Sequence, residues 1–249
     1  LAQSLGEDRP VFGIQARGLI GTDAPHTRID DAARDYIAEI RSIQPEGPYL
    51  IGGFSGGGIT AWEMAQQMTA SGDVVEALIL LDTPLPVRPS LSTTDKALIK
   101  LADIRKKGPG FFAEWVQDRI KWETRKRQTA RHDTGANAGF NNHKIEHAFR
   151  EAIQSYAVQE WQGPVTLYRP VLDRHWKVSG GKWVSQEREY VYPDNDWARF
   201  APALEVIEVP GDHDGMVLEP NVSVLGKAIR DLLARDIRGA AAAAKQAAE

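Results

Sequence analysis

The sequence predicts an α/β fold in which a mainly parallel sheet carries helices on both faces, with a helical insertion above one edge. Short apolar runs alternate with helical periodicity along most of the 249 residues, which is typical of strand–helix–strand units. This alternation stops between residues 85 and 162, which contain three helical patterns and no convincing strand. An insertion at this place would lie above the carboxyl ends of the strands, where such sheets bind ligands. We therefore interpret residues 85–162 as a lid.

The first half of the chain contains three predicted strands and two predicted helices. The strands are expected at Val11–Gln15, Tyr49–Phe54 and Ala77–Leu81. The third is an uninterrupted apolar run of the kind that is buried on both faces of a sheet. Helical spacing of apolar residues predicts helices over residues 29–43 and Gly57–Met68.

The second half begins with the lid and then returns to strands. Its expected elements are helices at 94–105, 111–128 and 143–158, strands at Pro164–Val171 and Leu204–Val209, and a closing helix at Asn221–Ala234. Residues 174–200 are irregular, with a turn or hairpin expected at Gly180–Gly181. We expect one domain over residues 1–238, followed by an Ala-rich tail at 239–249 that is either a linker or foreign to the domain and to which no function is assigned.

The composition excludes several classes of protein. The chain is 42% hydrophobic and 26% charged, which suits a globular domain with a sizeable core. No apolar run is long enough to predict a membrane span, and no signal-peptide pattern is visible. The absence of cysteine excludes disulfides, thiolate metal sites and a cysteine nucleophile, and fits a reducing, cytoplasmic compartment. The net charge of −4 argues against nucleic acid as the main partner.

The strongest local motif is Gly53–Phe54–Ser55–Gly56–Gly57, between a predicted strand and a predicted helix. This context is typical of the G-x-S-x-G nucleophile elbow of α/β-hydrolases. A tight turn there lifts the serine hydroxyl to the top of the sheet. We therefore predict Ser55 as the nucleophile, with the backbone N–H of Gly56 as a donor to the oxyanion.

A serine nucleophile needs a base, and His213 is the best-placed of the six histidines. It follows the Leu204–Val209 strand in Pro210–Gly211–Asp212–His213, which places it at the same sheet edge as Ser55. The others are interpreted as lid, surface or loop residues: His26, His132, His143, His147 and His175.

The acid that orients the histidine has two candidates at strand ends, Asp82 and Asp173. Both preserve the chain order Ser, acid, His. Asp82 follows a buried strand and precedes Thr83–Pro84, whereas Asp173 lies among basic residues and looks more solvated. Asp212 is adjacent to His213 and poorly placed to face it. Asp82 is the favoured acid, with Asp173 as the alternative.

Taken together, these segments resemble the type I thioesterase domains that end polyketide synthases and nonribosomal peptide synthetases. The resemblance spans about residues 1–235 and is weak through the lid. The segments that carry it are Leu1–Gly18, Gly47–Gly57, Ala77–Asp82, Gly163–Tyr168 and Val209–His213. The resemblance implies that Asp82 is the triad acid. Members of this family also have an earlier strand and a His-Gly-type loop that supplies a second oxyanion donor. The sequence lacks these, so an N-terminal truncation is expected.

The resemblance further implies an activity and a partner. Such domains release an acyl chain from the phosphopantetheine arm of a carrier protein, usually upstream in the same polypeptide, with no metal or bound cofactor. Hydrolysis and cyclisation use the same triad, so both remain open. The alternatives are a free-standing editing thioesterase or esterase and a non-catalytic hydrolase-fold binding module, although the latter usually lacks a triad member.

The lid has an unusual charge and an apolar stripe. From Lys96 to Arg131, eleven Lys and Arg stand against four Asp and Glu. One interpretation is a solvated helical face; the other is a docking site for an acidic carrier. The basic residues concerned are Lys106, Lys107, Arg125, Lys126 and Arg127. The apolar stripe, expected either to fix the lid to the core or to line an acyl channel, contains Phe111, Phe112, Trp115 and Ile120.

Overall fold

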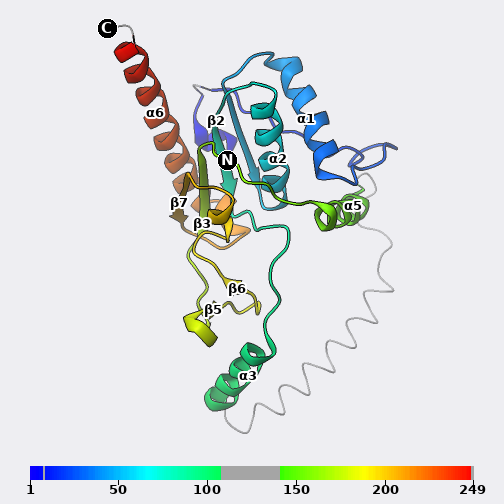
Figure 1. Cartoon of the computed structure of the whole chain (residues 1–249), viewed down its shortest axis with the longest axis vertical. Coiled ribbons are helices and arrows are strands. Elements are labelled where there is room, and N and C mark those ends of the chain that lie inside the picture. The colour runs from blue at the N-terminus through cyan, green and yellow to red at the C-terminus, as the bar shows by residue number, and fades with distance from the viewer. Residues whose placement is uncertain (8, 108–140, 248–249) are drawn as a thin grey trace.

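The computed structural model of the chain describes residues 1–7, 9–107 and 141–247 (Figure 1). Its centre is a four-stranded parallel sheet in the order β1-β2-β3-β7, and a second, antiparallel sheet has the order β4-β5-β6. The strands are β1 (Tyr49–Phe54), β2 (Val75–Leu81), β3 (Val165–Pro170), β4 (Trp176–Lys177), β5 (Trp183–Val184), β6 (Tyr190–Val191) and β7 (Leu204–Val209). The sequence thus predicted the four strands of the parallel sheet, with the bounds of β1 and β7 unchanged.

Helices cover both faces of the parallel sheet, as the sequence predicts (Figure 1). The described helices are α1 (Ile29–Ile43), α2 (Gly56–Ala70), α3 (Thr93–Lys107), α5 (Asn142–Ser155) and α6 (Asn221–Ala247), with short 3₁₀ turns η1 (Ala2–Leu5), η2 (Ser179–Gly181), η3 (Trp197–Arg199) and η4 (Gly215–Val217). On one face, α1 and α2 share a buried apolar cluster with β1, β2 and β3. On the other, α6 packs its apolar residues against Leu81, Tyr168 and Val209. The fold is therefore a three-layer α/β architecture.

The register of the parallel strands aligns their carboxyl ends. Phe54 of β1 lies opposite Leu81 of β2, and Leu81 lies opposite Tyr168 of β3. The pairing extends one residue further, because the N–H of Ser55 donates to the Leu81 carbonyl at 2.9 Å and that of Asp82 to the Tyr168 carbonyl at 2.7 Å. Ser55 and Asp82, which follow β1 and β2, therefore lie close together at the carboxyl edge of the sheet.

The two ends of the insertion are helical, as the sequence predicts. Helices α3 and α5 correspond to the patterns at 94–105 and 143–158. The pattern at 111–128, the apolar stripe and the basic residues Arg125–Arg127 lie outside the described residues. Figure 1 shows α3 near the small antiparallel sheet and α5 beside α1 and α2.

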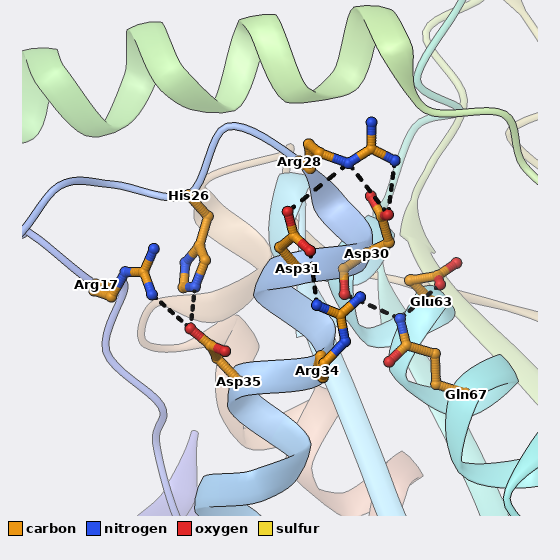
Figure 2. A network of polar contacts seen from close by, with 9 residues as sticks. All are labelled: Arg17, His26, Arg28, Asp30, Asp31, Arg34, Asp35, Glu63 and Gln67. Carbon is orange, nitrogen blue, oxygen red and sulfur yellow. Dashed lines mark hydrogen bonds and ion pairs between the residues drawn. The ribbon is translucent and has the colours of Figure 1, made fainter.

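A polar network holds the loop before α1 against that helix (Figure 2). Arg17 donates to Asp35 at 2.6 Å and His26 lies 2.7 Å from the same carboxylate oxygen. The same loop is hydrogen-bonded to the start of α5, because the Asn141 side chain donates to the carbonyls of Gly18 and Gly21 at 2.9 and 3.1 Å. The loop therefore connects α1 to α5.

Three expectations were wrong in detail. No strand forms at Val11–Gln15: Phe12 is 64% exposed, and no described strand pairs with this segment, which a strand requires for its backbone hydrogen bonds. The closing helix does not stop at Ala234, because α6 runs to Ala247 through the expected linker. Residues 174–200 are not wholly irregular, since they contain β4, β5 and β6, but the hairpin or turn expected at Gly180–Gly181 is confirmed because it connects the antiparallel strands β4 and β5.

Candidate active site

The turn between β1 and α2 has the strained backbone that a nucleophile elbow requires. Ser55 has φ 52° and ψ −124°, a conformation that few non-glycine residues adopt. The strain is accommodated by Gly53, where a Cβ atom would lie 2.4 Å from the backbone of Gly57. A larger residue at position 53 would therefore open the turn and displace the Ser55 hydroxyl.

Ser55, His213 and Asp82 form one hydrogen-bonded series. The Oγ of Ser55 lies 3.0 Å from Nε2 of His213, and Nδ1 of His213 lies 2.7 Å from Oδ2 of Asp82. An ionised carboxylate only accepts hydrogen bonds, so the proton of the neutral imidazole resides on Nδ1. Nε2 is then free to accept the proton of the Ser55 hydroxyl. This is the arrangement in which a histidine acts as a general base toward serine.

The two carboxylates considered from the sequence have different partners. Asp82 is followed by buried Thr83 and has a positive φ of 42°. Asp173 accepts a hydrogen bond from the backbone N–H of Gln186 at 2.6 Å instead of contacting His213. Asp212 accepts from the N–H of Gly215 at 2.7 Å. The sheet register therefore brings Asp82 to the histidine, and the other two carboxylates stabilise loops.

The environment favours the ionised acid and raises the basicity of the histidine. Burial by itself would raise the pKa of Asp82, but hydrogen bonds from His213 and Asn195 outweigh it and the net pKa is lowered. The hydrogen bond to Asp82 raises the pKa of His213 against a smaller opposing effect of burial. The charge of Asp214 raises the pKa of His213 further, and that of Arg88 lowers it.

The loop that carries His213 is fixed on both sides of the ring. Gly211 has φ 101°, and a Cβ there would lie 2.8 Å from the backbone nitrogen of Met216. Asn221, at the start of α6, donates to the Gly215 carbonyl at 3.1 Å. The ring of Phe54 stacks on the imidazole with a centroid separation of 5.0 Å. The imidazole is therefore oriented by packing as well as by Asp82.

Gly56 directly follows Ser55, so its backbone N–H can donate a hydrogen bond to an oxyanion that forms beside the Ser55 hydroxyl. It is the first residue of α2, and N–H groups in the first turn of a helix have no intrahelical acceptor. A Cβ on Gly56 would lie 2.5 Å from the ring of Phe149. Phe149 belongs to α5, so this helix packs directly against the residue next to Ser55.

Two residues of this site were missed by sequence reasoning. Asn195 donates to Oδ1 of Asp82 at 2.9 Å, and nothing in the irregular stretch around it indicates that role. Phe149 lies on the apolar face of α5, so its burial follows from helical periodicity but its contact with Gly56 does not.

Residues 1–7, 9–107 and 141–247 contain neither a cluster of metal-ligating side chains nor a membrane-spanning helix. Within these ranges, no group of three or more His, Asp or Glu side chains is arranged to hold a metal ion. None of the helices described there is long and apolar enough to cross a membrane.

Comparison with protein families then places the chain. Residues 1–136 match the family model described as the thioesterase domain, more than half of the 249 residues. The chain belongs to the thioesterase domain family. The family consists of hydrolases, in agreement with the geometry around Ser55.

The relatives of this thioesterase domain include very large synthases. Polyketide synthase PksR of Bacillus subtilis (strain 168) is 47% identical over 76 residues, which is 30% of this chain and 3% of that protein. Indigoidine synthase of Dickeya dadantii (strain 3937) is 29% identical over 252 residues, covering 92% of this chain and 16% of that protein. The thioesterase domain therefore spans only a small part of these relatives.

Solved structures of similar fold are also thioesterases. The NocB thioesterase domain, in a covalent complex with a fluorophosphonate nocardicin G analogue, has a TM-score of 0.52 and 25% identity over 85% of this chain and 77% of that one. The RedJ thioesterase of the prodiginine pathway in Streptomyces coelicolor has a TM-score of 0.54 and 16% identity, covering 92% of this chain and 78% of that one. At that identity the second likeness shows the fold alone.

Proposed function

We propose that this thioesterase domain releases a polyketide or peptidyl chain from a carrier protein through an acyl-enzyme on Ser55. The observation that carries the proposal is the hydrogen-bonded series from Ser55 to His213 at 3.0 Å and from His213 to Asp82 at 2.7 Å. The polyketide and peptide synthases among the relatives support the substrate class. The covalent fluorophosphonate complex of the NocB domain supports a nucleophile in the fold.

In the first half of the proposed reaction, the Ser55 oxygen attacks the thioester carbonyl carbon while His213 Nε2 takes the hydroxyl proton. The carbonyl oxygen becomes an oxyanion that the N–H of Gly56 stabilises. Asp82 stabilises the imidazolium that forms. When the carbon–sulfur bond breaks, His213 returns the proton to the carrier thiol, and the acyl group remains as an ester on Ser55.

In the second half, a nucleophile attacks the ester and transfers its proton to His213, which then protonates the departing Ser55 oxygen. Water as the nucleophile gives hydrolysis, and a hydroxyl or amine of the acyl chain gives macrocyclisation. Every proton is carried by His213, so the proposed reaction uses no metal or bound cofactor. We place the carrier upstream in the same polypeptide and the reaction in the reducing cytoplasm, in keeping with a chain that contains no cysteine.

Substitution of the nucleophile tests the proposal most directly. Ser55→Ala should lower kcat for a pantetheine thioester by about 10⁴-fold or more, because removal of the nucleophile of a triad has effects of this size. A fluorophosphonate probe should label the unmodified domain and not this variant, whereas exposed Ser42→Ala should label normally. Equal labelling of Ser55→Ala would overturn the assignment.

The released product identifies the substrate class. Mass spectrometry of the acyl-enzyme and product, with carrier-bound thioesters and simple esters compared in parallel, should show faster turnover of the carrier-bound substrates. Faster turnover of simple esters would instead favour a free-standing esterase.

The proposed base also predicts a pH dependence. His213 must be neutral to accept the Ser55 proton, and its pKa lies above the ordinary value of 6.5. The rate constant kcat/KM should therefore fall as the pH decreases through an apparent pKa above 6.5. An acid limb centred below 6.5 in a pH–rate profile would contradict this role.

A further inference from the structure

The carboxylate of Asp82 has a hydrogen-bond donor on each of its two oxygens. His213 Nδ1 donates to Oδ2 at 2.7 Å, and Asn195 Nδ2 donates to Oδ1 at 2.9 Å. The same Asn195 nitrogen lies 3.3 Å from the carbonyl oxygen of Thr83. Because both neighbours of the amide are acceptors, its nitrogen and not its oxygen must face them. The amide thus restrains rotation of the carboxylate through the oxygen that His213 does not use.

Asn195 lies in an unusual turn between β6 and η3. Asn195 and the following Asp196 both have left-handed backbone conformations, with φ of 50° and 69°. Asn and Asp are the non-glycine residues that most readily adopt this conformation, because their short polar side chains form local hydrogen bonds. The Asp194 carboxylate holds the turn by accepting from the N–H groups of Asp196 at 3.0 Å and Ala198 at 3.1 Å.

Two buried side chains anchor this turn to the parallel sheet. Arg169 of β3 is only 8% exposed, and its Nε donates to the carbonyl of Pro193 at 2.5 Å. Trp197 is fully buried, and its indole N–H donates to the carbonyl of Thr83 at 2.8 Å. The turn is therefore fixed on both sides of Asn195, and it is attached to the residue that follows Asp82.

The chemistry of an amide suits this place. An acid that orients a histidine has to remain ionised and has to keep one orientation. A neutral donor stabilises the buried anion and limits its rotation without cancelling its charge. A lysine or arginine would instead neutralise Asp82 and weaken its stabilisation of the imidazolium. We infer that Asn195 is a positioning residue of the triad that acts on the reaction through Asp82.

This inference rests on the proposed function, and Asn195→Ala and Asn195→Asp test it in the full chain. Both variants remove the donor, and the second keeps the shape of the side chain should the first fail to fold. We expect kcat for a pantetheine thioester to fall about tenfold to a hundredfold, the loss typical of one hydrogen bond to a charged group. KM should change little, because Asn195 acts through Asp82 and not on the substrate.

The pH–rate profile separates positioning from simple damage to the fold. Among the described residues, the charges that act on His213 are those of Asp82, Asp214 and Arg88. Without the Asn195 donor, the charge of Asp82 is less compensated and stabilises the imidazolium more strongly. The pKa of His213 should then rise, and the acid limb of kcat/KM should move to higher pH. Asn195→Asp should move it further, because it adds a second carboxylate. Arg199→Ala is the matched control, since it removes an exposed ion pair to Asp196 of the same turn, leaves the Asn195 amide and the Asp194 hydrogen bonds in place, and should not move the acid limb.

Each result has a defined meaning. A lower kcat with a shifted acid limb in the Asn195 variants alone supports the inference. An unshifted acid limb overturns it, whether or not kcat falls, and so does the same shift in Arg199→Ala. Ser55→Ala is measured in the same assay. If that variant is inactive while the Asn195 variants behave normally, only this inference fails; if Ser55→Ala remains active, the proposed function fails as well.

Discussion

Helices α3 and α5 flank the same insertion in the sequence, yet different parts of the protein hold them. Helix α3 is attached to the small antiparallel sheet. Its Asp95 is almost completely buried and accepts hydrogen bonds from the hydroxyls of Ser92, Ser179 and Tyr190. These donors keep the pKa of Asp95 well below its usual range. Further along α3, Asp103 accepts from the indole of Trp176 at 2.8 Å.

Helix α5 is attached at both ends to the part of the protein that contains α1 and α2. At its start, Asn141 donates to the carbonyls of Gly18 and Gly21. Just beyond its end, Tyr156 donates to a carboxylate oxygen of Glu63 on α2 at 2.8 Å. Between these anchors, Phe149 packs against Gly56.

The segment between β2 and β3 is therefore not held as one unit. Its second end, α5, is a wall of the proposed active site, fixed to the helix that follows Ser55. Its first end, α3, is bound to residues some eighty positions later in the chain. The segment that follows β6 of this small sheet contains Asn195, which donates a hydrogen bond to Asp82. The two ends can therefore be perturbed separately.

The largest effect is expected from the apolar contact beneath α3. Ile99 is 1% exposed and packs with Val178 and Val184. Ile99→Ala should destabilise this unit by about 2–5 kcal/mol, the range for truncation of a buried aliphatic side chain. Hydrogen exchange should accelerate over residues 93–106 and 176–191 and remain slow in α5. Leu101→Ala, at a position that is 54% exposed, should change stability by less than about 0.5 kcal/mol. Equal acceleration in α5 would show that the two ends form one unit.

A smaller effect, confined to activity, is expected from the wall that α5 provides. Phe149→Ala removes the ring that packs against Gly56 and opens space beside Ser55. We expect the ratio of kcat/KM for bulky over short acyl thioesters to rise about tenfold, within the range for altered apolar pockets. Ile153→Ala, in the same apolar cluster, is the control and should leave this ratio unchanged. An unchanged ratio in Phe149→Ala would place the acyl chain elsewhere.

The smallest effect is expected from the exposed ion pair between the segment after Asp82 and the small sheet. Arg88 donates to Glu189, and both side chains are about half exposed. Glu189→Gln should lower the free energy of unfolding by roughly 0.2–1 kcal/mol, and less in high salt, because solvent screens such pairs. Chemical denaturation at two salt concentrations measures this. A loss above that range would mean that the pair is essential to the attachment of the small sheet.

Elements with a strong local pattern were predictable from the sequence, and short or non-local ones were not. Strands β1 and β7 have the predicted bounds, and helix α1 forms over the residues whose apolar spacing predicts it. The strands of the small sheet are two residues long, too short to show any period. Asn195 could not be predicted, since its partner Asp82 lies 113 residues earlier in the chain.

The sequence by itself determined the fold class and the strained turn at Ser55, because a strand, a tight glycine turn and a helix are all local consequences of residues 49–70. It also placed His213 directly after a strand. Only the tertiary structure decided which carboxylate meets that histidine, since Asp82 and Asp173 both follow strands. The parallel register and the fixed loop after β7 bring together Asp82 and His213 from positions 131 residues apart, and a contact of that kind depends on how strands pair and not on any local pattern.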